Sequence, residues 1–518
     1  MKKTEIRNIA LLAPVLYLYL NIFLWSKNVS MFSVTELICS LGAIFVLSAL
    51  CYFIFYYLFS FFSATVQNVK RLKLGMGVLV GVFTGIICNF FFLRTLFYPH
   101  HHIAMYVLMV CIALIVYFNL AAYFVKFSYV LLLIASCGFV YNSYKNFSSV
   151  IEDTDKYLVE FKDKPNIYMI WLESFHGART LKDVYDVDVS PLTKFLEENK
   201  FTVCENMYSN FSYTLATMVD LFSLGTIDPF KFYFANSDVY SQLHKIIGGG
   251  AGNNVLKVLK YNGYITNVMV GGSYYFTNKE KYLDYAPIDL YGTSVVDNFR
   301  PCFAFTKNVD QLFLKMPVFF LKGSIKQNTE QQIDKMQKIK QPYFLSIKYE
   351  GTCHPIVNNY TYKQRTEWIT SGLYRQQAEK AIVEIPELIA LIIKKDPNAV
   401  IVMLGDHGAN TYGILANWVA GLENTDEKTF LKEIDNKLSN YIDDKFNVYG
   451  AIRLPAQYEK FSFENKEAYI NHRNIFVHIF SLLAQDPEYL KLQEIPVSNN
   501  GKWNLVKNGV VNEDFKFK

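Results

Sequence analysis

Two strand ends carry the residues of this chain whose types are best suited to chemistry. The first is Gly405-Asp406-His407-Gly408, which directly follows the apolar run 399–404. That run predicts a strand buried on both faces of a parallel sheet. Open α/β sheets place their chemistry at the carboxyl ends of such strands. Asp406 and His407 are metal-ligand types, and the flanking glycines allow backbone and ligand to approach closely. The alternative is an ordinary strand-to-loop turn.

A second strand also ends in an acidic residue. Segment 165–174 is an apolar run that closes on Leu172-Glu173-Ser174. Taken alone, Glu173 is explained as a carboxylate at a helix N-terminus, where the helix dipole favours it. Taken together with Asp406 and His407, it becomes a candidate third metal ligand.

The elements before these strands predict a membrane domain. Residues 1–145 are almost free of charge and rich in aromatics, whereas the rest has mixed charge. A bilayer crossing needs about 20 apolar residues. Five stretches approach that length, at approximately 9–25, 37–65, 75–93, 103–125 and 127–144. The first stretch lacks the small-residue cleavage site of a signal peptide, so we predict five membrane helices within residues 1–145.

Basic residues predict the orientation of these helices. They gather before the first stretch and between the second and third, whereas the alternate loops carry only Lys27 and Arg94. Basic loops stay in the cytoplasm, so an odd number of spans exports everything after about residue 145. We therefore predict a juxtamembrane linker at 146–164 and an extracytoplasmic catalytic domain at 165–518. The net charge of +5 is small for this length and argues against nucleic acid as a partner.

The exported part alternates between helical and extended patterns. Helices are predicted at 190–196, 255–260 and 374–395, and further strands at 264–270 and 342–349. Ser190 is expected to cap the first of these helices, with a proline in its first turn. Such alternation predicts an α/β domain with a mainly parallel central sheet.

The order of these features resembles the alkaline phosphatase and sulfatase superfamily. Membrane spans are followed by Leu172-Glu173-Ser174, then by a threonine segment, then by Gly-Asp-His-Gly. Within the superfamily, the chain resembles membrane-bound lipoteichoic acid synthases and the phosphoglycerol and phosphoethanolamine transferases. Phosphoethanolamine transferases usually have Gly-Glu-Ser and several disulfides, which three exported cysteines cannot supply. Lipoteichoic acid synthases often have an aromatic after Gly-Asp-His, where Gly408-Ala409-Asn410 stands here, so the headgroup stays open.

The resemblance implies a threonine nucleophile that also binds the metal. In segment 212–225, the position of Ser223-Leu224-Gly225 favours Thr214, with Thr217 and then Ser212 as alternatives. A divalent metal, zinc or manganese, would be held by four residues: Glu173, Thr214, Asp406 and His407. By the same resemblance His354, in the sequence Gly-Thr-Cys-His-Pro, would bind the phosphate or protonate the leaving alcohol.

The favoured function is metal-dependent transfer of a phosphoethanolamine or phosphoglycerol headgroup. The donor would be a membrane phospholipid, the intermediate a phospho-threonine, and the acceptor a surface glycan or a lipid-linked, lipopolysaccharide-type molecule. The resemblance places the protein in the bacterial inner (plasma) membrane, with its catalytic domain periplasmic or extracellular. The alternative is a phosphoric ester hydrolase of the same fold. A non-enzymatic membrane protein is disfavoured because no expected ligand is missing.

A sulfatase is also disfavoured by the sequence. Sulfatases need a cysteine or serine followed by x-Pro-x-Arg for conversion to formylglycine. The nearest segment, 353–357, has Val357 where the arginine is required.

Overall fold

The computed structural model of the protein describes most of the chain in two compact units. The described residues are 1–28, 34–88, 101–148, 151, 153–211, 213–227, 243–269, 280–285, 324–352, 372–409, 443–458, 472–494, 506–507 and 510–511. Described residues up to 148 belong to a helical unit, and those from 151 onward belong to an α/β unit.

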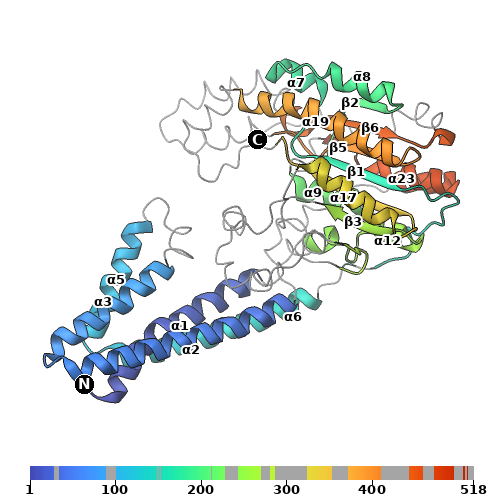
Figure 1. The fold of residues 1–518 in the computed structure, drawn as a ribbon. Coiled ribbons are helices and arrows are strands. Elements are labelled where there is room, and N and C mark those ends of the chain that lie inside the picture. Colours follow the sequence, from blue (N-terminus) through green and yellow to red (C-terminus); the bar gives the residue numbers. More distant parts are fainter. Residues whose placement is uncertain are drawn as a thin grey trace. The chain divides into compact units, whose positions relative to one another are not determined.

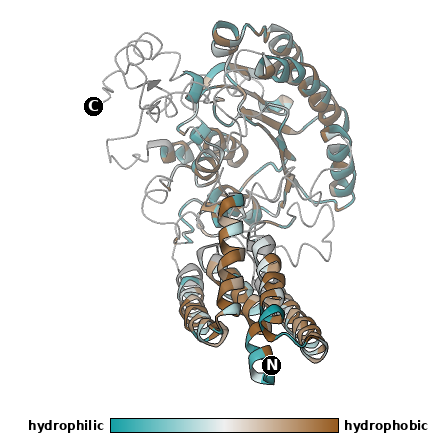
Figure 2. Cartoon of the chain, turned by 90° about the vertical axis from the view of Figure 1, so that its left-hand side faces the viewer, coloured by the Kyte–Doolittle hydropathy of each residue, from teal (hydrophilic) through white to brown (hydrophobic). Residues whose placement is uncertain are grey.

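The helical unit contains five apolar helices among its described residues (Figure 1). They are α1 (Lys3–Asn28), α2 (Val34–Thr65), α3 (Val69–Cys88), α5 (His101–Tyr117) and α6 (Ala121–Ser148). α1 packs against α2 and α6, and α3 packs against α5. Large apolar side chains also face outward, such as those of Ile54 and Leu133, each 64% exposed. Figure 2 shows hydrophobic colouring along much of these helices. An outward apolar surface of this kind suits anchoring in a membrane.

Three of these helices are long and apolar enough to cross a membrane, judged by length and composition. The candidate spans within them are Lys3–Phe23, Ile38–Thr65 and Ala121–Tyr144. The structure ends α5 at Tyr117, whereas the sequence pattern continued this span to residue 125. Asn119 adopts a left-handed conformation, with φ 62°, between α5 and α6. Apolar residues continue through the break, so hydropathy could not locate it. The count of five spans stays a prediction.

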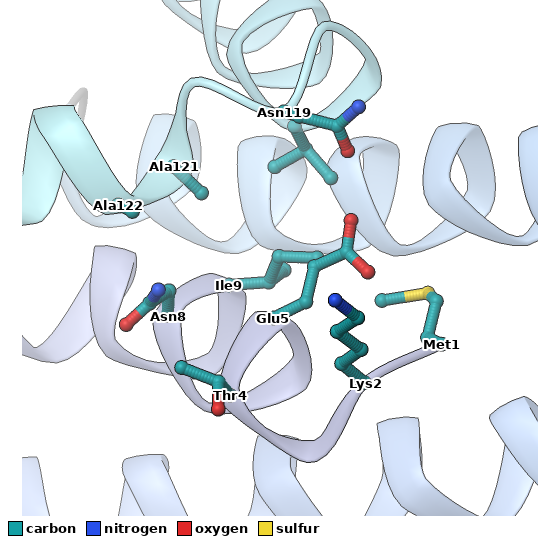
Figure 3. Close-up of a pocket in the computed structure, with 10 residues that line it drawn as sticks. Met1, Lys2, Thr4, Glu5, Asn8, Ile9, Asn119, Ala121 and Ala122 are labelled. Carbon is teal, nitrogen blue, oxygen red and sulfur yellow. The ribbon is translucent and has the colours of Figure 1, made fainter.

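A polar cluster lies in the helical unit where the start of α1 meets the turn between α5 and α6. Lys73 of α3 forms an ion pair with Glu5 and donates a hydrogen bond to Asn119 Oδ1. These residues adjoin a pocket of about 600 Å³ (Figure 3). Met1, Lys2, Thr4, Glu5, Asn8, Ile9, Val116, Asn119, Ala121 and Ala122 line it.

The α/β unit is built on a six-stranded sheet of order β2-β6-β5-β1-β4-β3. Its strands are β1 (Ile167–Leu172), β2 (Thr202–Tyr208), β3 (Ile265–Met269), β4 (Tyr343–Tyr349), β5 (Val400–Gly405) and β6 (Asn447–Arg453). The four strands β3, β4, β1 and β5 are parallel, β6 is antiparallel to β5, and β2 is antiparallel to β6. β1 lies between β4 and β5, and Leu172 pairs with both Tyr349 and Gly405. The carboxyl ends of the three central strands are therefore level.

Helices contribute to a separate apolar core on each face of this sheet (Figure 1). One core joins Met169 and Trp171 of β1 to α9 (Thr214–Phe222), α12 (Asn254–Tyr261) and α23 (His472–Ala484). The other joins Tyr168 and Ile170 to α7 (Ala178–Tyr185), α8 (Ser190–Glu198), α17 (Ile325–Gln337) and α19 (Leu373–Lys395). Successive side chains of a strand point to opposite faces, so both faces of β1 must be apolar.

The predicted α/β fold with its mainly parallel sheet is confirmed. The predicted helices occur as α8, α12 and α19, and the further predicted strands occur as β3 and β4. The expected cap of α8 was wrong, because Ser190 is the first helical residue and Val189 occupies the cap position. The carboxylate of Asp188 instead accepts a hydrogen bond from the Ser190 backbone N–H at 3.0 Å.

Candidate active site at the carboxyl ends of β1 and β5

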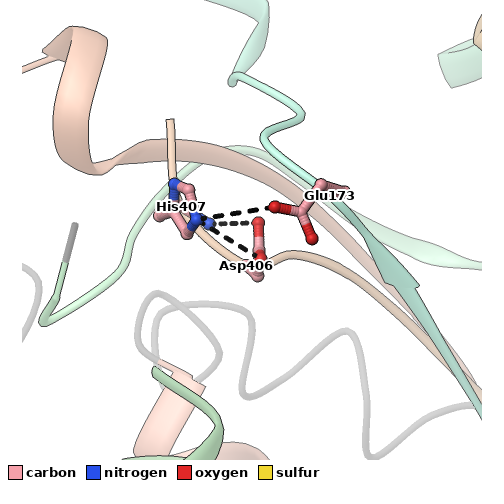
Figure 4. Close-up of side chains that lie close together, drawn as sticks. All are labelled: Glu173, Asp406 and His407. Carbon is pink, nitrogen blue, oxygen red and sulfur yellow. Dashed lines mark hydrogen bonds and ion pairs between the residues drawn. The ribbon is translucent and has the colours of Figure 1, made fainter. Parts of the chain in front are cut away.

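Glu173, Asp406 and His407 lie together where β1 and β5 end (Figure 4). Leu172 pairs with Gly405, so the residues that follow the two strands meet at one level. One ligand atom from each side chain lies within 4.8 Å of the others, and all three residues are buried. His407 Nε2 is 3.9 Å from Glu173 Oε1 and 3.5 Å from Asp406 Oδ2. This buried group could bind a metal ion.

The two glycines beside Asp406 and His407 are required by close packing. A Cβ atom at Gly405 would lie 2.4 Å from the carbonyl oxygen of Phe175. At Gly408 it would lie 2.1 Å from the carbonyl oxygen of Asp444. Real Cβ atoms do not approach backbone oxygens so closely, so any side chain at either position would displace the loop that holds Asp406 and His407.

Asp406 divides its two carboxylate oxygens between different tasks. Oδ1 accepts hydrogen bonds from the backbone N–H groups of Ser174, at 2.8 Å, and His407, at 2.7 Å. Oδ2 is buried and has no hydrogen-bond partner among the residues that the structure describes. Burial raises the pKa of the Asp406 carboxyl; His407 and Lys348 oppose that rise, while the Glu173 carboxylate adds to it. A buried carboxylate oxygen left in this state is a suitable metal donor.

His407 is held so that one ring nitrogen faces the cluster. Its Nδ1 atom lies 2.6 Å from the carbonyl oxygen of Gly408. A carbonyl oxygen can only accept a hydrogen bond, so Nδ1 is the donor in this contact. Nε2 is the ring nitrogen that lies beside Thr214 Oγ1, at 3.1 Å. Metal-binding histidines are oriented in this way by backbone carbonyls. The ring is therefore prepared to act as a ligand through Nε2.

Thr214 brings a hydroxyl group to the same cluster from the first residue of α9. Its Oγ1 atom lies 3.2 Å from Glu173 Oε1 and 3.1 Å from His407 Nε2, and the residue is 2% exposed. Thr217 instead donates to the backbone carbonyls of Phe211 and Tyr213, each at 3.3 Å. Of the two described threonines, Thr214 is the one hydrogen-bonded to the cluster. The candidates Ser212 and His354 lie outside the described residues.

Sequence reasoning missed Lys348, which lies one residue before the end of β4. Its ammonium nitrogen is 2.5 Å from Glu173 Oε2, and its side chain is 5% exposed. Glu173 is fixed further through its backbone, since its N–H donates to the Tyr349 carbonyl and its carbonyl accepts from Thr352 Oγ1. The available signal was a lysine inside the otherwise largely apolar run 343–349.

A buried ion pair joins α9 to α23 on the far side of Thr214's helix. The Arg473 guanidinium contacts Asp220 Oδ1 through Nη2, at 2.6 Å, and Nε, at 3.2 Å. Asn210 donates to Asp220 Oδ2 at 2.8 Å. A buried ion pair with this hydrogen-bond geometry restrains the two helices that carry its residues. The pair therefore helps to fix where α9 begins.

His472, the first residue of α23, supports the strand end behind the cluster. Its Nε2 atom donates to the carbonyl oxygen of Gly405 at 2.7 Å. Burial lowers the pKa of His472 to about 4, so the ring is neutral at pH 7. His472 thus acts on the backbone directly before Asp406.

Comparisons with known proteins give structural similarity at low sequence identity. No family model and no curated protein matches the sequence. Among solved structures, the integral membrane lipooligosaccharide phosphoethanolamine transferase A of Neisseria meningitidis is 12% identical. That alignment covers 93% of this chain and 95% of the other, with a TM-score of 0.41.

Two further solved structures match a smaller share of the chain. The C-terminal periplasmic domain of phosphoethanolamine transferase EptC from Campylobacter jejuni is 9% identical, covering 64% of this chain and 94% of that one, with a TM-score of 0.35. Lipoteichoic acid synthase LtaP of Listeria monocytogenes is 15% identical, covering 61% and 71%, with a TM-score of 0.31. The chain is structurally similar to membrane phosphoethanolamine transferases and to lipoteichoic acid synthase-like enzymes of the alkaline phosphatase superfamily.

Proposed function

We propose that the protein transfers a phospho-alcohol headgroup from a membrane phospholipid to a surface acceptor, with Thr214 as nucleophile. The headgroup is phosphoethanolamine or phosphoglycerol, and the acceptor is a surface glycan or a lipopolysaccharide-type molecule. The observation that carries the proposal is the position of Thr214 Oγ1, within 3.2 Å of both Glu173 Oε1 and His407 Nε2. A hydroxyl placed against two metal-ligand types, in a buried site, is placed for activation.

The residues of the cluster fit a bound divalent metal. Two carboxylates and one imidazole converge, Asp406 Oδ2 has no described hydrogen-bond partner, and His407 presents Nε2. We propose Glu173, Thr214, Asp406 and His407 as the ligands, with zinc or manganese as the ion. This mixed nitrogen and oxygen set suits either ion. When bound, the ion would lower the pKa of the threonine hydroxyl and withdraw charge from the phosphoryl oxygens.

The chain's own groups account for the two halves of the reaction. In the first half, Thr214 Oγ1 forms a bond to phosphorus while the bond from phosphorus to the diacylglycerol oxygen breaks. Thr214 Oγ1 donates a hydrogen bond to Glu173 Oε1 at 3.2 Å, so this carboxylate is placed to accept the hydroxyl proton, while His407 Nε2 is reserved for the metal. In the second half, an acceptor hydroxyl loses its proton and forms a bond to phosphorus while the bond from phosphorus to Thr214 Oγ1 breaks. Thr214 regains its proton, so the enzyme returns to its starting state. Diacylglycerol departs as an alcohol, and His354 is proposed to supply its proton or to hold the phosphate.

The fixed surroundings of Thr214 support in-line transfer. As the first residue of α9, Thr214 lies at the positive end of a helix dipole, which favours a developing negative charge. The Asp220–Arg473 pair restrains the same helix from its other end. A nucleophile held in one position needs less reorganisation to reach the transition state.

We propose the domain organisation that the sequence predicts for this reaction. Residues 1–145 would form five membrane helices, 146–164 a juxtamembrane linker, and 165–518 an extracytoplasmic catalytic domain of a bacterial inner-membrane protein. A tethered domain benefits from the high effective concentration of a lipid donor. Reporter fusions at residue 145 and in the loop near residue 68 test this arrangement. The proposal requires the first fusion to report outside and the second inside.

Release of diacylglycerol tests the proposed reaction. The full-length protein is reconstituted with zinc or manganese in vesicles of phosphatidylethanolamine or phosphatidylglycerol, with and without a glycolipid acceptor. We expect diacylglycerol from one of the two lipids, with the headgroup recovered on the acceptor, and neither product from Asp406→Asn. Free headgroup phosphate produced at the same rate without an acceptor would establish the hydrolase instead. Absence of diacylglycerol from both lipids would overturn the proposal.

A further inference from the structure

Lys348 is a buried cation at a position where the strand pattern calls for an apolar residue. It lies on β4, beside β1, and its side chain is 5% exposed. Its ammonium nitrogen is 2.5 Å from Glu173 Oε2 and 3.6 Å from Glu350 Oε1. Desolvation of a lysine is costly, so a lysine buried here must be stabilised by the carboxylate that it contacts.

The contact with Lys348 divides the two oxygens of Glu173. Oε2 faces the ammonium group, whereas Oε1 faces Thr214 Oγ1 at 3.2 Å and His407 Nε2 at 3.9 Å. A carboxylate free of such a contact could turn both oxygens toward one cation. In this arrangement Glu173 presents a single oxygen to the cluster.

Lys348 also changes the charge of the cluster. Glu173 and Asp406 bring two buried carboxylates to it. The ammonium group offsets one of the two negative charges. Charges interact strongly at such distances inside a protein, so a fixed cation weakens the attraction of the site for a second cation.

We propose that Lys348 is a positioning residue that makes Glu173 a one-oxygen ligand and limits how tightly the cluster holds a divalent metal. This inference rests on the metal site of the proposed function. A weaker hold leaves more of the ion's charge for other oxygens that it binds, including those of a phosphoryl group. Lys348 therefore lowers the affinity of the cluster for the metal ion and makes the bound ion a stronger electrophile.

Metal affinity in charge variants tests the inference. Purified full-length protein is stripped with chelator, and zinc binding is measured at pH 8 by competition with a chromogenic chelator. Lys348→Met, which keeps length and removes charge, is expected to bind zinc about tenfold tighter or more. Lys348→Arg, which keeps the charge, is expected to stay within about threefold of wild type. Glu350→Gln is the matched control, because it changes the other carboxylate near Lys348, and its affinity should not change.

Thermal unfolding with and without zinc separates this role from simple packing. The Lys348→Met variant without zinc should melt well below wild type, since Glu173 loses its partner, and zinc should restore most of the difference. If that variant does not fold, Lys348→Gln, a neutral hydrogen-bond donor, serves in its place with the same expected tightening. Equal or weaker zinc binding by both neutral variants would overturn the role of Lys348. Failure of the wild-type protein to bind zinc or manganese would instead overturn the proposed metal site.

Discussion

The two ends of the central strands both carry polar groups, yet these groups differ in their burial and in how their hydrogen bonds are satisfied. At the amino ends, the Asp396 carboxylate accepts hydrogen bonds from Asn166 Nδ2, at 2.6 Å, and from the Tyr168 hydroxyl, at 3.2 Å. The Tyr343 hydroxyl forms a hydrogen bond with the Tyr168 hydroxyl. The backbone N–H of Tyr343 donates to Asn166 Oδ1. This network joins β1 and β4 to the C-terminal end of α19 through one carboxylate and several neutral donors.

At the carboxyl ends of the same strands, the buried carboxylates are not fully satisfied by the described hydrogen-bond donors around them. Glu173 and Asp406 are both buried, and Asp406 Oδ2 has no described hydrogen-bond partner. A satisfied network stabilises the fold that contains it, whereas a surplus of buried charge costs stability unless a counter-charge binds. The amino-end network therefore suits a structural role, whereas the carboxyl-end cluster could bind a metal ion. Variants at the two ends can break or sharpen this distinction.

The largest expected effect is at Thr214, the proposed nucleophile. Thr214→Ala removes the hydroxyl that contacts Glu173 and His407, and headgroup transfer should fall about 1,000-fold or more. Thr217→Ala is the matched control, because Thr217 lies on the same helix and bonds only to backbone carbonyls among its described contacts. Its transfer rate should stay within about threefold of wild type. Equal losses in both variants would mean that α9 is merely structural.

The next largest effect separates the carboxylates at the two ends. Asp406→Asn removes one proposed ligand, so metal affinity should fall at least about a hundredfold. Without metal, this variant should be as stable as wild type or more stable, because a buried unsatisfied charge is gone. The measurements are metal content after dialysis and unfolding by denaturant after chelation.

Asp396→Asn should give the opposite pattern at the amino ends. It weakens the hydrogen bonds from Asn166 and Tyr168, and the free energy of unfolding should fall by about 1–3 kcal/mol. Metal affinity and transfer should be unchanged. A loss of metal from Asp396→Asn, or a loss of stability from Asp406→Asn alone, would contradict the distinction between the two ends.

A smaller effect is expected from Lys445, whose carbonyl accepts a hydrogen bond from Gly408 N at 2.8 Å. Burial lowers the pKa of Lys445 from 10.5 to about 8, although Asp444 opposes the shift. In the unfolded chain the Lys445 ammonium group keeps its proton up to a higher pH than in the folded protein. The free energy of unfolding of the wild type should therefore rise between about pH 8 and 10.5. Lys445→Met should stabilise the protein by about 1–2 kcal/mol at pH 7, and the gain should shrink over that range.

Denaturant unfolding at pH 7, 9 and 10.5 measures this effect. A gain that is constant with pH would show that Lys445 keeps its proton in the folded protein. The substitution Lys394→Met, on the last turn of α19, is a surface control for loss of a lysine and should change stability by less than about 0.5 kcal/mol.

The sequence located the cluster because its residues follow strands that are easy to recognise. The runs before Glu173 and Asp406 are apolar on both faces, and parallel strands bring their carboxyl ends to one edge. That logic places Glu173 near Asp406 and His407 without coordinates. The position of Thr214 came from a resemblance of motifs, since no periodic pattern indicates which threonine of a helix faces a strand end.

Other features depend on tertiary contacts that sequence patterns do not contain. The lysine in the largely apolar run 343–349 marks an unusual position, but the sequence does not show which carboxylate Lys348 contacts, because that depends on the pairing of β4 with β1. The Arg473–Asp220 pair joins residues far apart in the chain, and neither side chain is unusual in its own helix. The cap position of α8 is Val189 and not Ser190, and the side chain that binds the backbone there is that of Asp188, because aspartate and serine are both suited to helix starts.

Intact mass spectrometry of the protein after incubation with a phospholipid donor tests the central claim most directly. The metal-loaded protein is incubated with phosphatidylethanolamine and, separately, with phosphatidylglycerol, and Thr214→Ala and Thr217→Ala are treated alike. The account predicts the added mass of one phosphate headgroup from one of the two lipids in wild type and in Thr217→Ala, and no added mass in Thr214→Ala. An adduct that survives in Thr214→Ala, or no adduct from either lipid in the folded, metal-loaded wild type, would contradict it.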